Sequence, residues 1–358
     1  MITPNTGERL IADEARRIYA EAELRTIEKL VKYINQGTDA EEYSQMWAQQ
    51  KLSDLRKLKG EINEDVIAYL KNFDDEVMEA VDEAYKLGQK SAEADLRKVG
   101  QLEVSGQFTA TNQRTVEALA SDLVNKLDST HLRILRQSED VYREVIGEAT
   151  QNLAAGVETR QEAAQSALNK FANRGVTGFT DSAGRSWSLP SYAEMATRTA
   201  SGRAAIDGHL DRAKENGKDL VIVSEHGEEC VLCRPWERQV LSISGNSNEY
   251  PSMSEARAAG LFHANCRHSV SVYIPELTED VGNKKKYQDP DGSEVRQTQR
   301  YNERQIRKWK KRKVAALTDK EEQKAQRYIS KWQKKQRDFL DETDRRRKYE
   351  REQINAVR

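Results

Sequence analysis

The chain has 358 residues, of which 33% are charged and 37% hydrophobic, and its formal net charge is −1. This composition is too polar for one large packed core, although apolar residues recur at regular spacing, which argues against general disorder. With no stretch near the roughly 18–20 apolar residues that cross a bilayer, no secretory signal pattern at the start and an odd number of cysteines, the chain is expected to be soluble and made in a reducing cytoplasm.

The first 175 residues are predicted to form successive long helices. Apolar residues recur at helical spacing in four stretches: 10–22, 24–34, about 115–155 and 159–172. Three glycines are expected to end helices: Gly60, Gly88 and Gly100. Residues 101–108 are expected to form a loop or a short strand. Narrow apolar stripes and abundant charge leave two interpretations open, an autonomous bundle or a helical arm that docks on a larger assembly.

Residues 176–281 have a different sequence pattern, with turns and short strands, and are predicted to form a small α+β module. A hairpin is expected around the turn at 181–184, and a helix from Pro190 to about Asn216. Three short strands and a short helix should follow: strands 220–223, 240–243 and 269–274, and helix 252–259. The predicted fold class is therefore mainly α, with a central α+β zinc-binding module between long N-terminal helices and a basic helical tail.

The predicted zinc site comes from the clustering of all three cysteines in this module. Cys230 and Cys233 are separated by two residues, as are His263 and Cys266. Two such turns can direct three thiolates and one imidazole at one ion, which is a preferred shell of structural zinc. A module with few large apolar residues would be stabilised by a metal ion that links the two turns.

Other assignments of these residues remain open. His226 or His268 could replace one of the four ligands or lie beside them. The cysteines could simply be buried and the histidines exposed, or the zinc could be catalytic, with an open position. A nucleophilic cysteine with His263 or His268 as base would compete with zinc for the same thiol. No phosphate-binding glycine loop and no nucleophile elbow occur, so no enzymatic activity is expected.

The region 282–358 is predicted to be a basic helical tail. It carries 25 Lys and Arg against 13 Asp and Glu, whereas residues 1–281 carry 33 against 46. A turn is expected at 289–292 and a break with a fresh helix cap at 317–319. Four aromatic residues are interleaved with the basic ones: Tyr301, Trp309, Tyr328 and Trp332. The tail is either a helix that neutralises DNA phosphates and stacks on bases or a solvated helix whose aromatic residues pack on a partner.

Several short motifs occur in a characteristic order between residues 186 and 273. They are Trp187 to Leu189, Tyr192 to Met195, Arg198-Thr199, Gly217 to Ser224, Cys230 to Trp236, Leu241 to Gly245, Tyr250-Pro251 and Leu261 to Ser269. In these motifs the stretch resembles the phage minor capsid protein 2 family, which is related to the Mu F-type head morphogenesis proteins. Two departures are Ala264, where the family usually has Pro, and Glu237, Arg238 and Gln239, where a Gly is usual.

The resemblance implies a structural minor capsid protein of a tailed bacteriophage, synthesised in the host bacterial cytoplasm and carried in the virion. It would lie near the portal inside the head and assist assembly, DNA packaging or DNA delivery. The region 1–175 would dock on the portal or another head protein, 176–281 would be the minor-capsid module, and 283–358 would face packaged double-stranded DNA. The alternative from another class is a zinc-dependent nuclease or a toxin effector delivered with the DNA.

Overall fold

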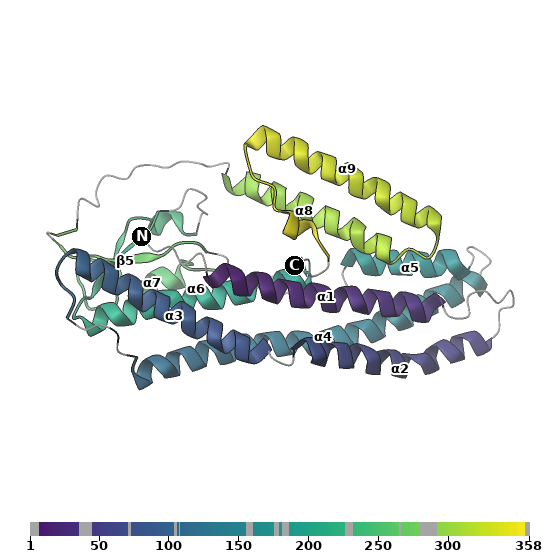
Figure 1. The fold of residues 1–358 in the computed structure, drawn as a ribbon, viewed down its shortest axis with the longest axis horizontal. Helices are drawn as coiled ribbons and strands as arrows, with labels where there is room; N and C mark the ends of the chain where they lie inside the picture. Colours follow the sequence, from purple (N-terminus) through teal and green to yellow (C-terminus); the bar gives the residue numbers. More distant parts are fainter. Residues whose placement is uncertain are drawn as a thin grey trace. The chain divides into compact units, whose positions relative to one another are not determined.

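The computed structural model describes residues 7–35, 45–70, 73–103, 106, 108–154, 160–174, 179–180, 186–225, 232–264, 266–275, 277–278 and 292–354. The described part is mainly helical, as predicted (Figure 1). Its helices are α1 (Gly7–Asn35), α2 (Gln45–Leu70), α3 (Phe73–Lys98), α4 (Ala110–Ala154), α5 (Arg160–Arg174), α6 (Leu189–Glu215), α7 (Met253–Ala258), α8 (Gly292–Val314) and α9 (Asp319–Thr343). Among these helices, none has the length and apolar character required to cross a membrane.

The chain divides into two compact units, each made of interleaved ranges. Unit 1 comprises residues 1–15, 73–126 and 194–295, and unit 2 comprises residues 16–72, 127–193 and 296–358. The two units are defined by which backbone segments pack together in space. The three consecutive regions were inferred from the sequence alone. The division at 175/176 and 281/282 therefore stays a prediction.

Two of the three predicted helix-ending glycines lie inside helices, so those predictions were wrong. Gly60 lies within α2 and Gly88 within α3, and only Gly100 follows the end of a helix, with φ +67°. The two apolar stretches at 10–34 likewise form one continuous helix, α1. The loop expected after Gly100 is present, with no strand among its described residues.

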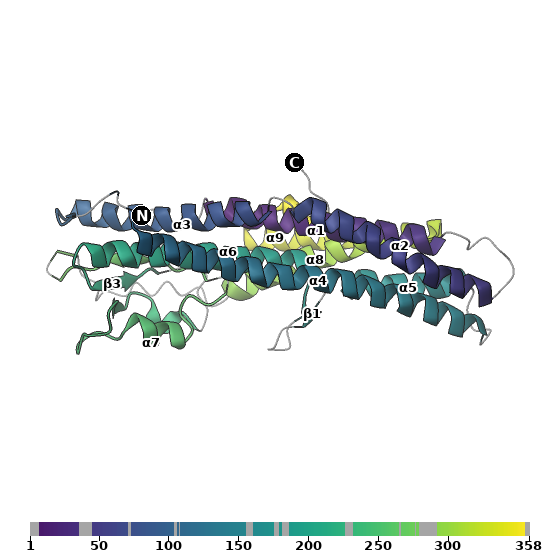
Figure 2. The ribbon, with the colours of Figure 1, turned by 90° about the horizontal axis from the view of Figure 1, so that it is seen from below.

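The α+β elements of unit 1 agree with the prediction. A three-stranded antiparallel sheet has the order β4–β3–β5, with β3 (Leu220–Val223) between β4 (Val240–Ser242) and β5 (Val270–Val272). The short helix α7 begins at a capping box in which Ser252 and Glu255 satisfy each other's backbone N–H groups. Figure 2 shows α3 and α7 on opposite sides of α6.

The predicted hairpin before α6 is also present. It is formed by β1 (Phe179–Thr180) and β2 (Ser186–Trp187), which pair antiparallel with Phe179 opposite Trp187. The turn expected at 181–184 lies outside the described residues.

A hydrophobic core lies between the sheet, α6 and α7. It includes the buried residues Ile206, Leu210, Val221, Leu241, Met253, Phe262 and Val270. Cys233 is fully buried in the same cluster, and the partly buried Cys266 packs against it. Two of the side chains predicted to bind metal, Cys233 and Cys266, are therefore in contact with the apolar core.

Helices α3 and α6 approach each other so closely that both need glycine at the crossing. A Cβ atom added at Gly88 would lie 1.9 Å from the carbonyl oxygen of Ala205, and one added at Gly208 would lie 2.2 Å from that of Tyr85. Such distances are far below van der Waals contact. Gly88 is therefore needed inside α3 because the backbone of α6 lies against it, and a larger residue would not fit. The local sequence around Gly88 does not contain this information.

A buried polar network joins α3, α4 and α6 beside this crossing. The Tyr85 hydroxyl donates to Asp211 at 2.6 Å and accepts from the Asn112 amide at 2.8 Å. Arg212, fully buried, lies 3.0 Å from Glu215 and 3.4 Å from Glu93. Because each of these groups would be costly to bury alone, the network ties the three helices to one arrangement.

His209, on α6, makes the stability of unit 1 dependent on pH. Only 3% of its surface is exposed, and burial lowers its pKa from 6.5 to about 4. The carboxylate of Asp95 lies 4.0 Å from the His209 ring, and the pKa of Asp95 is itself raised by burial. His209 is therefore neutral in the folded protein at pH values where it would be protonated in the unfolded chain.

We expect the free energy of unfolding to fall as the pH falls from about 6.5 to about 4, because unfolding takes up a proton at His209 in this window. The contribution of His209 amounts to at most about 3 kcal/mol. Urea titrations at pH 7, 5.5 and 4.5 should show that the free energy of unfolding falls less with decreasing pH in His209→Leu than in wild type. Equal losses in the two proteins would contradict this assignment.

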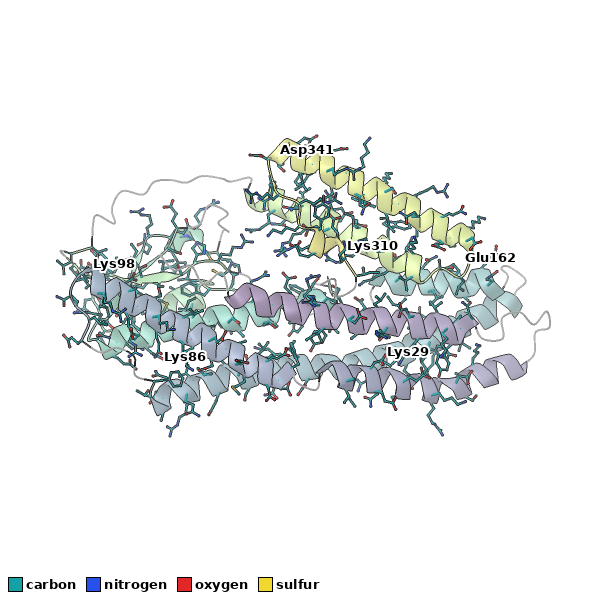
Figure 3. The ribbon with its side chains drawn as sticks, in the orientation of Figure 1. Lys29, Lys86, Lys98, Glu162, Lys310 and Asp341 are labelled. Atoms are coloured by element: carbon teal, nitrogen blue, oxygen red, sulfur yellow. The ribbon has the colours of Figure 1, made fainter. Side chains whose placement is uncertain are left out.

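In unit 2, ion pairs and hydrogen bonds link the helices. Lys29 of α1, labelled in Figure 3, pairs with Asp65 of α2 at 2.8 Å, and the Tyr33 hydroxyl donates to Glu61 at 2.6 Å. Gln165 of α5 donates to the carbonyl of Ala315 and accepts from the N–H of Leu317, the latter at 2.6 Å. These two bonds stabilise the predicted break between α8 and α9, where Thr318 caps α9.

Helices α8 and α9 form an antiparallel hairpin held by the aromatic residues of the tail (Figure 1). The rings of Trp309 and Tyr328 stack at a centroid distance of 4.0 Å, and Tyr301 meets Trp332 edge to face at 5.7 Å. The faces of Trp309 and Tyr328 that cover each other are not open to nucleic-acid bases. Their packing within the hairpin therefore closes one face of each of these two rings to stacking on DNA, while Tyr301 and Tyr328 stay 45% and 38% exposed.

The expectation of helix to the end of the chain was wrong. Helix α9 ends at Thr343, its C-cap Asp344 adopts a left-handed conformation with φ 48°, and a 3₁₀ turn, η2 (Tyr349–Glu352), is the one helical element among the described residues that follow. This terminal segment is bonded to α8: Arg307 donates to the carbonyl of Arg351, and Lys310 donates to Gln353 at 2.6 Å. The segment covers α8 instead of extending α9.

Candidate metal centre

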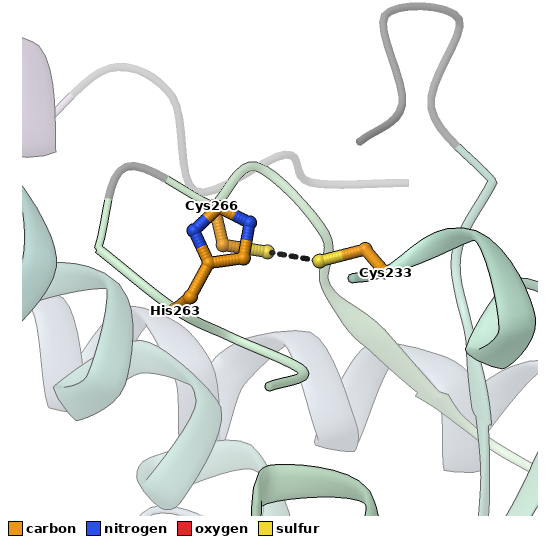
Figure 4. Close-up of side chains that lie close together, drawn as sticks. All are labelled: Cys233, His263 and Cys266. Carbon is orange, nitrogen blue, oxygen red and sulfur yellow. Dashed lines mark hydrogen bonds between the residues drawn. The ribbon is translucent and has the colours of Figure 1, made fainter. Parts of the chain in front are cut away.

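Three of the four predicted zinc ligands lie together in unit 1. The potential ligand atoms of Cys233, His263 and Cys266 are all within 4.8 Å of one another (Figure 4). Cys233 lies directly before the 3₁₀ turn η1 (Arg234–Trp236), whereas His263 and Cys266 lie between α7 and β5. The structure thus brings together two motifs about thirty residues apart. Cys230 and His226 lie outside the described residues.

Each motif forms a tight turn that directs its side chain toward the other. The N–H of Trp236 donates to the carbonyl of Cys233, and the N–H of Cys266 donates to the carbonyl of His263, both at 2.9 Å. Phe262 precedes His263 in a left-handed conformation, φ 59°, while its ring is buried in the core. A bulky residue rarely adopts this conformation, so the turn before His263 carries backbone strain that the core holds in place.

The separation of the two sulfurs suits a shared metal ion. The Sγ atoms of Cys233 and Cys266 are 3.6 Å apart, and neither cysteine forms a disulfide. Two thiolates on one tetrahedral zinc, each about 2.3 Å from the ion, lie roughly 3.8 Å apart. The observed spacing is close to this value and much longer than the roughly 2.05 Å of a disulfide bond.

The tautomer of His263 also suits metal binding. Its Nδ1 lies 2.7 Å from the carbonyl oxygen of Ala264. A carbonyl can only accept, so Nδ1 carries the proton and Nε2 keeps its lone pair. Donation of one ring N–H to a backbone carbonyl is the usual way in which metal-binding histidines are oriented.

The environment of Cys266 favours the thiolate. The hydrogen bond with Cys233 lowers the pKa of Cys266, burial raises it, and the side chain and backbone N–H of His268 lower it further, to about 4. The Nδ1 and backbone nitrogen of His268 are 3.3 and 3.4 Å from the Cys266 sulfur. A metal binds the thiolate form of cysteine, so these contacts prepare the ligand.

His268, one of the two alternative ligands, is held by a carboxylate that the sequence did not identify. Its Nε2 lies 2.6 Å from Glu237, and both side chains are largely buried. Burial lowers the pKa of His268, but hydrogen bonds with Cys266 and Glu237 outweigh it and raise the pKa overall. With both ring nitrogens engaged, His268 is arranged to support Cys266 rather than to replace His263.

Glu237 escaped the sequence analysis because acidic residues are abundant and its partner is 31 positions away. The only local signal was that it stands in the segment where the related family usually has a glycine. The next residue, Arg238, has φ 59°, the left-handed conformation that glycine adopts without strain. The departure from the family pattern therefore falls on a turn with an unusual backbone.

The arrangement is chemically compatible with two roles. Cys266, His268 and Glu237 form the series of thiol, imidazole and carboxylate that a nucleophilic cysteine uses. However, a second sulfur, that of Cys233, lies 3.6 Å from Cys266, and a third donor, His263, completes a group within reach of one ion. Convergence of three such donors in a buried position is characteristic of a structural metal site.

Comparisons with known proteins agree with the sequence resemblance. A structural protein of Lactococcus phage LL-H is 27% identical over 281 residues, which cover 72% of this chain and 75% of that protein. A structural protein of Lactococcus phage mv4 is 34% identical over 119 residues, which cover 30% of this chain and 95% of that protein. No solved structure gives a significant match.

These matches concern structural proteins of phage particles, and none of them supports the nuclease or toxin alternative. The sequence model of one family, described as phage minor capsid protein 2, matches residues 4–341, nearly the whole chain. The chain therefore belongs to the phage minor capsid protein 2 family and is a structural protein of the virion.

Proposed function

We propose that this chain is a non-enzymatic component of the phage head, located at the portal vertex on the inside, where it assists assembly or DNA packaging and delivery. The observation that carries the proposal is the Cys233–His263–Cys266 cluster within the core of unit 1. Ligands that belong to a packed core suit a site that maintains a shape. A head protein needs a fixed surface for its neighbours, and a metal-held module supplies one.

The proposed ion is zinc, bound by Cys230, Cys233, His263 and Cys266. Four protein ligands close the coordination shell and leave no position for water or substrate, which distinguishes a structural from a catalytic zinc. His268 and Glu237 then act next to the shell, where hydrogen bonds to the Cys266 sulfur stabilise its negative charge. The spacing of the two sulfurs, the tautomer of His263 and the burial of Cys233 support this role.

Contact with packaged DNA is proposed for the tail 283–358, through charge and without base stacking. Basic side chains are exposed along α9: Lys320, Arg327, Lys331, Lys334, Lys335 and Arg337. Acidic residues of the same helix, among them Asp338 and Asp341, are exposed as well and weaken the positive field. Binding of this kind would fall steeply with salt and would show little sequence preference.

The position in the head is tested by reconstructing purified particles without imposed symmetry and by cross-linking. We expect density for this chain on the inner side of the portal vertex, and cross-links between residues 1–175 and the portal protein. Particles that lack this protein should assemble defective heads or deliver less DNA. Density on the outer capsid surface, or normal assembly and infection without the protein, would refute the proposal.

The zinc site is tested by measuring the metal content of the purified full-length protein. We expect about one zinc per chain in wild type and less than about half of that in Cys266→Ser, because one thiolate of the tetrahedral shell is lost. His268→Gln should keep its zinc, since His268 is not a ligand. Met253→Ala, which weakens the same core without removing a ligand, is the matched control and should also keep its zinc.

Two results would decide against this ligand set. A wild-type protein without stoichiometric zinc would remove the site altogether. Loss of zinc in His268→Gln together with retention in His263→Ala would show that His268 is the fourth ligand in place of His263.

A further inference from the structure

A second charged site lies in unit 2. It is a small pocket with a volume of about 310 Å³ including its open mouth. Its polar lining comes from α1, from the start of α6 and the residue before it, from α8 and from the segment after η2: Arg16, Glu23, Ser188, Ser191, Arg307, Lys311 and Gln353. The open pocket offers room for a small ion. The charges around it indicate which ion.

Arg16 is the feature that points to a ligand. Only 7% of its surface is exposed, and its Nε is buried without a hydrogen-bond partner among the described residues. A buried N–H of a guanidinium without an acceptor is costly, because it has lost its water partner and gained none. An acceptor placed in the pocket would satisfy it.

The carboxylate in the pocket is already engaged by another residue. Glu23, 1% exposed, forms an ion pair with Lys311 of α8 at 2.5 Å. Arg307 adds a further positive charge, although it also donates to the carbonyl of Arg351. Three cationic side chains therefore face one carboxylate, and the pocket keeps an excess of positive charge.

The amino end of α6 adds to this positive potential. The helix begins at Leu189 and runs for 27 residues, so its first peptide groups present the positive end of a long helix dipole. Ser188 and Ser191 lie at this end, and their hydroxyls are 2.9 Å apart. Hydroxyl and free backbone N–H groups at a helix start are the usual donors to bound oxyanions.

We propose that this pocket binds a phosphate group, with Arg16 as its principal contact. The tetrahedral oxyanion accepts hydrogen bonds from the planar guanidinium and from the start of α6, and it neutralises the charge excess beside Glu23 and Lys311. The group is either free inorganic phosphate or a phosphodiester of double-stranded DNA. The inference is independent of zinc binding and of the position at the portal.

The test uses the full-length protein, inorganic phosphate and a chloride control at equal ionic strength. We expect saturable binding by calorimetry and an increase in Tm with phosphate. Arg16→Gln should weaken the affinity by at least about tenfold, since a charge-assisted contact is lost. The control Arg25→Gln should bind within about twofold of wild type, because Arg25, on the same helix, is half exposed and pairs with Glu21 at the surface.

A second variant separates loss of binding from loss of folding. Ser191→Asp places a carboxylate at the start of α6, where it favours the helix and occupies the phosphate position. This protein should be folded and at least as stable as wild type, yet its Tm should no longer respond to phosphate. If wild type shows no saturable phosphate effect, or if Ser191→Asp and Arg16→Gln respond as wild type does, the proposal is overturned.

A short DNA duplex distinguishes the two sources of the phosphate group. If the group belongs to DNA, the duplex competes with inorganic phosphate, and Arg16→Gln weakens duplex binding more than Arg25→Gln does. If the site takes the free ion, duplex binding is equal in the two variants while phosphate binding still depends on Arg16. Both results support the site and assign its ligand.

Discussion

If the protein binds the proposed zinc, its removal by a chelator is expected to lower the free energy of unfolding of the wild-type protein by at least about 4 kcal/mol. The physical reason is the position of Cys233, which is fully buried, and of Cys266, which packs against the same core. Without an ion, two sulfurs that lie 3.6 Å apart lose the positive charge that compensates their thiolates. The measurement is a urea titration with and without chelator, in the presence of a reductant that prevents oxidation of the two thiols.

The same experiment on variants shows whether the loss arises from the metal. Cys266→Ser should unfold at the same urea concentration with and without chelator, because its zinc is already lost. Met253→Ala should be less stable than wild type, by about 2–5 kcal/mol for a buried large-to-small change. Addition of chelator should nevertheless lower its free energy of unfolding by the same amount as in wild type. If the wild-type transition does not move with chelator, no metal stabilises the module.

Gly88→Ala is expected to destabilise unit 1 by about 3 kcal/mol or more, whereas Gly60→Ala stabilises the protein by about 1 kcal/mol. The same methyl group is added inside a helix in both cases. At Gly88 it would lie 1.9 Å from the Ala205 carbonyl oxygen, so α3 and α6 must separate. At Gly60, in α2, no atom lies within 4 Å of the added Cβ, and only the better helix propensity of alanine remains.

Urea denaturation of both variants tests this difference in sign. Gly208→Ala is the reciprocal change on α6 and should resemble Gly88→Ala, because its Cβ would lie 2.2 Å from the Tyr85 carbonyl oxygen. The double variant should cost less than the sum of the two single ones, since one separation of the helices relieves both clashes. A neutral or stabilising Gly88→Ala would show that the helices do not meet as closely as described.

Local signals in the sequence were sufficient for much of the fold. The capped start of α7 at Ser252, the break before α9 at Thr318 and the strand at 220–223 all follow from residues a few positions apart, and all are present. The predicted metal site also rests on local information. Two turns, each placing two potential ligands three positions apart, already imply convergence on one ion, and the three described members of that set do converge.

Other features depend on residues that are distant in the sequence. Whether a glycine ends a helix or lies in its middle depends on the neighbouring helix, as Gly88 and Ala205 show. Whether one face of an aromatic ring is covered or open depends on the hairpin partner, as the stacked rings of Trp309 and Tyr328 show. A periodic sequence pattern contains the same residues in either case, so it leaves both outcomes open.

The sequence by itself determined the mainly helical class, the α+β module, the family and the two cysteine–histidine motifs, because each of these is encoded by spacing within a few residues. Only the tertiary structure paired His268 with Glu237 and brought Arg16 beside Lys311 and the start of α6. The reason is that the energy of a charge depends on which groups surround it in space. Those groups come from segments that the order of residues alone does not bring together.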